Sequence, residues 1–166
     1  MRFAPIRDAK GHCVPSLYAG STVEAAIYET VFHDIPLSAD RKTVSRDAVE
    51  QRNHSALLVG RDLRLASLRA PDLLKWGVRR EQLVGSLPTQ YERTARWAQA
   101  IHRQFEDVDG LIWTSNLCDP DAALLLFGDR LAVADIQIVA MREGTDGSFL
   151  GDVRDAGERG GIRISL

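Results

Sequence analysis

Short apolar runs that alternate irregularly with helix patterns most constrain how this chain can fold. Runs of this kind, bounded by turn residues, indicate β-strands. They predict strands at residues 2–6, 16–19, 55–59, 63–68, 111–114 and 131–140, with a tight turn at 60–62 joining the third and fourth. Because the helix patterns do not follow every strand in turn, regular βαβ units are not expected, and the pattern predicts an α+β fold.

Two capping boxes predict where the longer helices begin. Residues 21–24 (Ser-Thr-Val-Glu) and 89–92 (Thr-Gln-Tyr-Glu) each place a hydroxyl three residues before a carboxyl, so both can satisfy free backbone amides. The first helix is expected to run to His33, because the residue before Pro36 disfavours helical backbone. The second is expected to end near residue 109, with one apolar stripe made of Thr94, Trp97, Ala98, Ile101 and Phe105.

Three further segments carry weaker patterns. Residues 71–76 predict a short helix, because proline is well tolerated at the first helical position. Residues 122–127 are compatible with a helix and with a buried strand, and the sequence does not decide between them. Residues 143–161 are rich in glycine and acidic residues, which predicts a surface loop or a short turn-broken element.

Length and composition bound the class of protein. The chain has 166 residues, 45% of them hydrophobic, which is enough for one globular domain over residues 1–166. Its formal net charge is −2 and its charges are interspersed, so nucleic acid is not expected as a direct partner. No apolar stretch approaches the roughly 20 residues that span a membrane, so a soluble cytoplasmic protein is expected. Cys13 and Cys118 stand far apart and indicate neither a disulfide framework nor a metal site.

Glu29 is the strongest candidate for chemistry. On a helix over residues 22–33 it lies among small and apolar residues, and the opposite face of that helix is apolar as well. A carboxylate sealed there without a partner would cost several kcal/mol. It must therefore reach either an arginine, as a structural ion pair, or a cavity that holds ligand and water. The pattern alone leaves both interpretations open, although ion pairs are common at such positions.

Further residues could line a cleft with this carboxylate. Tyr18 and Ser115 each lie at the end of a predicted strand, where side chains often face a binding site. Arg2 could hold a phosphate through two parallel charge-assisted hydrogen bonds, and Arg7 could serve instead. His33 lies one helical turn after the glutamate and shares its face.

Six segments that contain these residues have a pattern in common with one protein family. They are RFAPI at residues 2–6, LYAGS at 17–21, EAAIYETVFHD at 24–34, WAQAIH at 97–102, DGLIWTS at 109–115 and LFGDR at 126–130. Together they resemble the RES domain of bacterial toxin–antitoxin pairs. The resemblance covers nearly the whole chain up to about residue 130, and the eleven-residue step from Tyr18 to Glu29 is its most specific part.

The resemblance implies a fold, an activity and a partner. The fold would be a single compact domain related to the ADP-ribosyltransferases, with mixed or antiparallel sheets and flanking helices. The activity would break the bond between nicotinamide and ribose in NAD⁺, by hydrolysis or phosphorolysis, or would transfer ADP-ribose to a protein. The partner would be an antitoxin with an Xre-like DNA-binding region.

The family is named for an arginine, a glutamate and a serine, which the resemblance assigns to Arg2, Glu29 and Ser115, with a pocket tyrosine at Tyr18. On this interpretation Glu29 stabilises positive charge on the ribose, and Arg2 holds phosphate. Tyr18 covers the nicotinamide, Ser115 bonds to the nicotinamide or the ribose, and His33 lines the same pocket. NAD⁺ would be a substrate, so neither a cofactor nor a metal is expected. The rival hypothesis is a non-catalytic nucleotide-binding module of the same fold that acts by contacting a partner protein.

Overall fold

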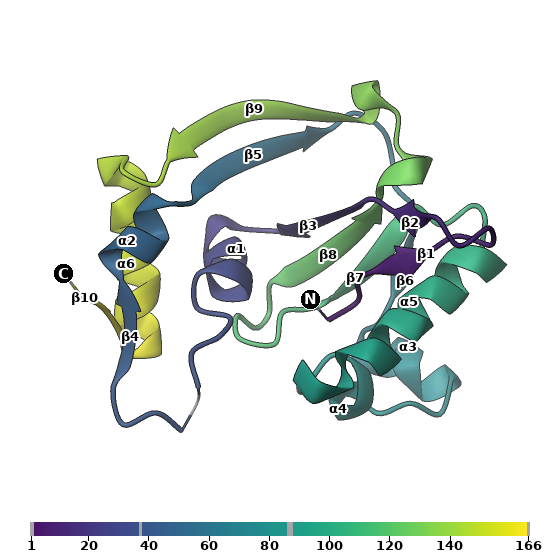
Figure 1. The fold of residues 1–166 in the computed structure, drawn as a ribbon, viewed down its shortest axis with the longest axis horizontal. Helices are drawn as coiled ribbons and strands as arrows, with labels where there is room; N and C mark the ends of the chain where they lie inside the picture. Colours follow the sequence, from purple (N-terminus) through teal and green to yellow (C-terminus); the bar gives the residue numbers. More distant parts are fainter. Residues whose placement is uncertain (1, 37, 86–87, 166) are drawn as a thin grey trace.

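A four-stranded sheet lies at the centre of the molecule (Figure 1) in the computed structural model, which describes residues 2–36, 38–85 and 88–165. Its strands, in spatial order, are β3 (Ser16–Gly20), β8 (Ala122–Phe127), β7 (Gly110–Thr114) and β6 (Leu65–Ser67). β6 runs parallel to β7, and the other neighbours are antiparallel. The two inner strands, GLIWT and AALLLF, carry no charge, which suits strands covered on both faces.

Smaller elements flank this sheet on two sides (Figure 1). One side carries β1 (Ile6–Arg7), β2 (Cys13–Val14), α3 (Ala70–Lys75), α4 (Arg80–Leu83) and α5 (Tyr91–Gln104). The other side carries α1 (Val23–Thr30), β4 (Lys42–Ser45), α2 (Arg46–Glu50), α6 (Gly147–Gly160) and β10 (Ile162–Ser165). The predicted α+β class with mixed and antiparallel sheets is confirmed. None of the helices, in the part of the chain that the structure describes, has the length and apolar character needed to cross a membrane.

Two groups of buried apolar side chains hold these parts together. The first lies between the sheet and α5, and its largest members are Phe3, Trp113, Phe127, Leu111 and Leu125. The second lies between α1 and α6, and includes Ile27, Phe32, Phe149 and Val153. Tyr18 packs against the first group and Ala25 belongs to the second. The chain therefore passes from one core to the other within a few residues, between β3 and α1.

α1 begins directly after β3, and Gly20 makes this close approach possible. The Thr22 hydroxyl caps the helix by accepting a hydrogen bond from the Ala25 amide at 3.0 Å. A Cβ atom at Gly20 would lie 2.5 Å from the backbone nitrogen of Ala26 and 3.0 Å from the carbonyl carbon of Ala25. Only glycine leaves room for this contact, so Gly20 fixes how α1 sits against the sheet.

The capping box predicted at residues 21–24 is wrong. Thr22 caps the helix, while the Ser21 hydroxyl accepts a hydrogen bond from the Ala122 amide at 2.9 Å. Glu24 does not reach back to the cap but forms an ion pair with Arg159 at 2.9 Å. The long-range bond to β8 and the ion pair to α6 replace the local pattern, because both neighbours lie within reach of the first turn of α1.

The capping box predicted at residues 89–92 is also wrong. A 3-10 helix, Pro88–Gln90, precedes α5, and the Gln90 side chain makes no capping bond. The apolar stripe of α5 is confirmed at Thr94, Ala98 and Ile101, which are buried. Both long helices end earlier than predicted, α1 before His33 and α5 before Phe105, whose side chain is 47% exposed.

The strands predicted at residues 55–59 and 63–68 exist, but the hairpin between them does not. The first belongs to β5 (Asn53–Val59), which pairs with β9 (Ile136–Glu143), and the second belongs to β6, which pairs with β7. The intervening segment crosses between sheets, and Arg61 within it pairs with Asp109 at 2.7 Å and with Asp135 at 3.1 Å.

Four other segments were predicted with mixed success. Residues 2–6 form a turn and only the start of β1, because the Phe3 amide bonds to a side chain and not to a neighbouring strand. The strand predicted at residues 131–140 begins later, after the 3-10 helices Gly128–Arg130 and Val133–Asp135. The helix at residues 71–76 is confirmed as α3, and the undecided segment 122–127 is the central strand β8.

The loop predicted at residues 143–161 is wrong, because this segment contains α6. Asp146 caps the helix, because its carboxylate accepts hydrogen bonds from the backbone amides of Ser148 at 2.8 Å and Phe149 at 3.2 Å. The buried residues recur every three or four positions, at Phe149, Val153, Ala156 and Gly157. A Cβ atom at Gly160 would lie 2.7 Å from the hydroxyl of Tyr28. This glycine therefore serves close helix packing and does not mark a loop.

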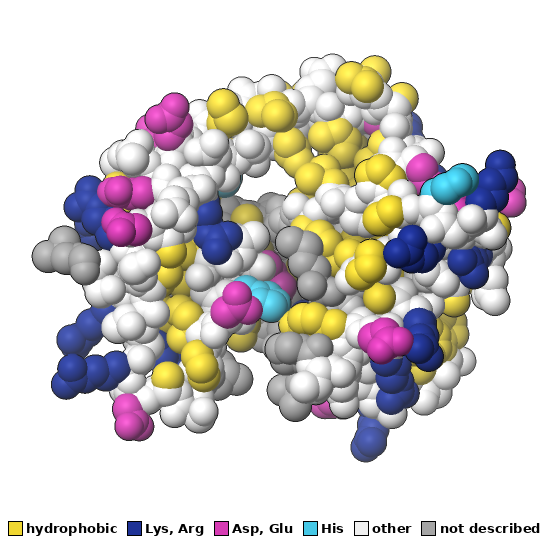
Figure 2. Space-filling model, viewed as in Figure 1, with side chains coloured by type: hydrophobic (Ala, Val, Ile, Leu, Met, Phe, Trp, Pro, Cys, Tyr) yellow, Lys and Arg dark blue, Asp and Glu magenta, His cyan; other side chains and the backbone are white. Residues whose placement is uncertain are grey.

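β5 and β9 form an arch that joins the two sides of the molecule above the central sheet (Figure 1). Figure 2 shows apolar side chains gathered on this arch, and a hollow in the same face beneath it. Five large apolar residues of the arch are 44 to 64% exposed, namely Leu58, Val59, Ile138, Val139 and Met141. The arch therefore contributes little to either core.

Gly20→Ala is expected to lower the free energy of unfolding by about 2 kcal/mol, because the new Cβ displaces the backbone of α1. Urea unfolding measures the change. Gly147→Ala is the matched control, since no atom lies within 4 Å of a Cβ placed there, and alanine favours the helix. Equal stability of the two variants would contradict the close contact at Gly20.

Candidate functional site

Glu29 lies in the last turn of α1 and is held by the turn that follows β7. The Ser115 hydroxyl donates a hydrogen bond to Oε1 of Glu29 at 2.7 Å. The backbone N–H of Asn116 donates to the same oxygen at 3.1 Å. The sequence left open whether Glu29 pairs with an arginine, and among the described residues it has no such ion pair. Glu29 and Ser115 are thus brought together as predicted, through a direct bond between them.

The Ser115 hydroxyl is oriented by its surroundings. The side chain is fully buried, and its oxygen accepts hydrogen bonds from the amides of Cys118 at 3.1 Å and Leu117 at 3.4 Å. A hydroxyl has one proton to donate and two lone pairs to accept with, so all its capacity is used. Ser115 therefore acts on Glu29 in this structure and has no proton left for a ligand.

Arg2 and Tyr18 form a second group, built on the N-terminal segment and β3. The Tyr18 hydroxyl accepts a hydrogen bond from the Phe3 amide at 3.1 Å. Burial raises the pKa of Tyr18 to about 12, although the Phe3 amide and the nearby Arg2 charge oppose this shift. The guanidinium of Arg2 lies over the ring of Tyr91, 5.6 Å from its centre, and the Thr94 hydroxyl donates to the Arg2 carbonyl.

Arg2 carries a buried positive charge that no carboxylate among the described residues pairs with. The residue is 8% exposed, and its buried Nε atom has no hydrogen-bond partner in the part of the chain that the structure describes. Within residues 2–36, 38–85 and 88–165 the guanidinium takes part in no ion pair. Burying an unpaired charged donor is unfavourable, so this position suits an anionic ligand. Arg7, the predicted alternative, is exposed and donates to the Gly11 carbonyl at 2.9 Å, outside this group.

His33 and Tyr91 contact each other, and Tyr91 also contacts the Arg2 group. His33 lies just after the end of α1, and its Nε2 atom is 3.4 Å from the Tyr91 hydroxyl. Its Nδ1 atom contacts Asp34 at 2.9 Å. The ring of Tyr91 in turn makes a cation–π contact with the Arg2 guanidinium. Glu29 and Ser115 are thus hydrogen-bonded to each other, whereas His33 reaches the Arg2 group through Tyr91.

A groove of about 500 Å³ opens beside the Arg2 group. It is lined by residues of α5 and of the N-terminal segment, namely Tyr91, Glu92, Ala95, Arg96, Gln99, Ala4, Pro5 and Arg7. This volume is in the range of small-molecule sites. Neither Arg2 nor Glu29 is among its lining residues, and the groove meets the Arg2 group through Tyr91.

Tyr91, Asn116 and Arg80 belong to the site and were not predicted. Tyr91 precedes the apolar stripe of α5 by one turn, and this helical spacing is the signal that could have found it. The Asn116 amide and the Arg80 guanidinium act through the backbone of the turn after β7. No sequence pattern indicates such contacts, because they depend on the fold.

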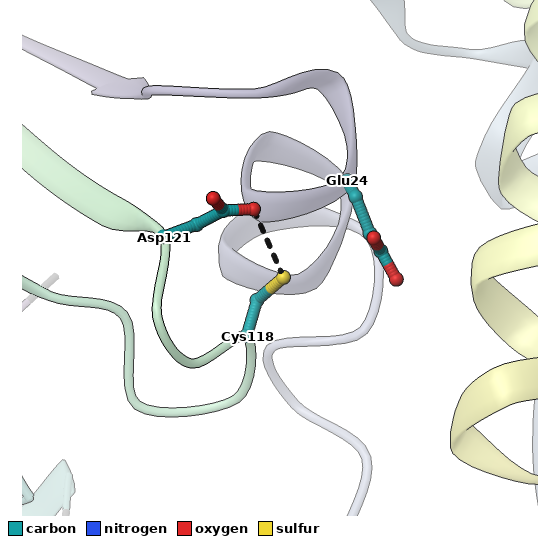
Figure 3. A group of neighbouring side chains, drawn as sticks. All are labelled: Glu24, Cys118 and Asp121. Carbon is teal, nitrogen blue, oxygen red and sulfur yellow. Dashed lines mark hydrogen bonds between the residues drawn. The ribbon is translucent and has the colours of Figure 1, made fainter.

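Glu24, Cys118 and Asp121 form a separate group of potential metal ligands (Figure 3), with one atom from each within 4.8 Å of the others. Each has a protein partner. Glu24 extends toward α6 and pairs with Arg159, whereas Asp121 accepts hydrogen bonds from Thr22 at 2.6 Å and from the Cys118 thiol at 3.6 Å. Burial raises the pKa of the Cys118 thiol to about 11, which disfavours the thiolate that metals require. The group is therefore explained by contacts that tie α1 to its neighbours.

Comparison with known families matches the RES domain over residues 2–149 of the 166-residue chain. The chain belongs to the RES domain family. No curated protein and no solved structure matched it. Membership confirms the resemblance drawn from the sequence and agrees with the α+β architecture, because RES domains are ADP-ribosyltransferase-like. It also supports a toxin-like, NAD-related role in general terms.

Tyr18 in this RES domain is expected to ionise near pH 12. The unfolded chain loses the same proton near pH 10, so the stability that the proton contributes is present below about pH 10 and lost as the pH rises toward 12. The ultraviolet absorbance of tyrosinate, taken as the difference between wild type and Tyr18→Phe, measures this. In denaturant the difference should appear near pH 10. A difference near pH 10 in the folded proteins would contradict the buried phenol.

Proposed function

We propose that this RES domain protein cleaves NAD⁺ at the bond between nicotinamide and ribose. One observation carries the proposal, namely the way in which Glu29 is held. Its Oε1 atom accepts two hydrogen bonds from the turn after β7, while Oε2 accepts none from the described residues. A carboxylate fixed by one oxygen presents the other in a defined direction, which is what stabilisation of a developing positive charge requires.

The reaction breaks the bond between C1′ of the ribose and the ring nitrogen of nicotinamide. The bonding electrons stay with the nitrogen, so the cationic ring leaves as neutral nicotinamide, and the ribose gains oxocarbenium character. The free oxygen of Glu29 stabilises this charge and can hold a ribose hydroxyl. A water, a phosphate or a protein side chain then donates an electron pair to C1′ and releases its proton where it carries one.

The second group of residues suits the rest of the dinucleotide. Arg2 holds the phosphates, since its guanidinium is buried, has no ion-pair partner among the described residues and lies over the ring of Tyr91. Tyr18 stays uncharged at neutral pH and offers an aromatic ring toward nicotinamide. His33 lines the space between Tyr91 and the glutamate. Ser115 positions the carboxylate, and none of these steps requires a metal or a cofactor.

The same proposal includes the biological setting of a toxin. The protein would be the toxin of a bacterial type II pair, and an antitoxin with an Xre-like DNA-binding region would cover its active site. Expression of the protein alone should then arrest growth and lower cellular NAD⁺. Co-expression with the product of the neighbouring reading frame should restore both.

Glu29→Gln is expected to lower the rate of nicotinamide release from NAD⁺ by about 10²- to 10³-fold, because the amide cannot stabilise positive charge as a carboxylate does. Release is measured with purified protein alone, with inorganic phosphate and with cell lysate, which separates hydrolysis, phosphorolysis and transfer to a protein. Glu24→Gln is the matched control, since this residue lies on the same helix but pairs with Arg159. It should retain the wild-type rate.

Two outcomes would count against the proposal. Wild type that releases no nicotinamide under any of the three conditions would exclude the activity, and full activity of Glu29→Gln would exclude the assigned role. Recovery of intact NAD⁺ from a tight complex, without growth arrest, would favour a nucleotide-binding module that contacts a partner protein.

A further inference from the structure

Arg80 lies behind the turn that holds Glu29. It is the first residue of α4 and is half-buried. Its Nη1 atom donates a hydrogen bond to Oδ1 of Asn116 at 3.3 Å, and its Nη2 atom donates to the carbonyl oxygens of Thr114 and Ser115, also at 3.3 Å. Among the described residues Arg80 has no carboxylate partner within ion-pair distance. Its charge is therefore directed at this turn.

One peptide group connects the arginine to the glutamate. The Ser115 carbonyl accepts from Arg80, and the N–H of the same peptide, which belongs to Asn116, donates to Oε1 of Glu29 at 3.1 Å. Hydrogen bonds in series polarise one another, so a cation on the carbonyl strengthens the N–H as a donor. The second bond to the glutamate comes from the Ser115 hydroxyl. Arg80 also fixes this residue, because it donates to the Ser115 carbonyl.

We propose that Arg80 is a positioning residue for Glu29, acting through the peptide group between Ser115 and Asn116. The inference rests on the proposed function, because it names what orients the carboxylate that acts on NAD⁺. One planar guanidinium donates hydrogen bonds to three acceptors of this turn. A lysine ammonium cannot donate to the same three acceptors with this geometry. Arg80 itself does not need to touch the substrate.

Arg80→Met is expected to lower kcat for nicotinamide release about tenfold and to leave KM within about twofold of wild type, because the carboxylate acts in the transition state more than in binding. Arg80→Lys keeps the charge but loses the planar fork, so its kcat should lie between those of wild type and Arg80→Met. Arg79→Met is the matched control, since Arg79 is the preceding residue and is exposed. It should match wild type in both constants.

Hydrogen exchange of the Asn116 amide, followed by nuclear magnetic resonance, gives a readout that needs no activity. The amide should exchange faster in Arg80→Met, while the amides of β7 and β8 keep their protection. Wild-type kcat in both Arg80 variants, or unchanged exchange at Asn116, would overturn the inference and leave the proposed function intact. A wild type without activity would instead defeat the proposed function, and the exchange rate alone would then decide the role of Arg80.

Discussion

The hydrogen bonds from the turn after β7 to Glu29 join two parts of the molecule that pack separately. Glu29 belongs to α1, whose buried side chains contact α6, whereas β7 belongs to the core between the sheet and α5. A hydrogen bond to a charged group contributes only about 1.5–3 kcal/mol, which is small beside the burial of either core. The bonds at Ser115 and Asn116 therefore do not hold the fold together, but their geometry depends on both cores being in place.

Several elements of the fold followed from local sequence, and the failures have a common physical cause. β7 and the body of α5 were predicted because their apolar patterns match the structure that forms. The strand β8 could not be decided, since one of its two partners, β3, comes from the far N-terminal part of the chain. α6 was missed because its glycines read as turn residues, whereas Gly160 lies against Tyr28 and allows close packing. Tertiary contacts overrode local preference in each case.

For the candidate site as well, local sequence patterns indicated residues but not the contacts between them. Helical periodicity identified Glu29 and His33 as neighbours on one face, and strand ends identified Tyr18 and Ser115, but no pattern predicted that Ser115 would bond directly to Glu29. Terminal residues are usually mobile, so the position of Arg2 was the least predictable. The structure ties it down from α5, through the bond from Thr94 and the ring of Tyr91. Contacts made through backbone groups, such as those of Arg80, leave no signature in residue types.

The charges at Arg2 and Glu29 are consistent with the proposed ligand and do not stabilise each other. Arg2 and Glu29 carry opposite charges and do not form an ion pair with each other. Leaving a buried guanidinium unpaired costs stability, and proteins tolerate such costs mainly where function requires them. NAD⁺ presents a cationic ring at one end and phosphates next to it. Under the proposed function, a fixed carboxylate and a guanidinium that has no ion-pair partner among the described residues would complement that distribution, and pairing the two residues directly would remove it.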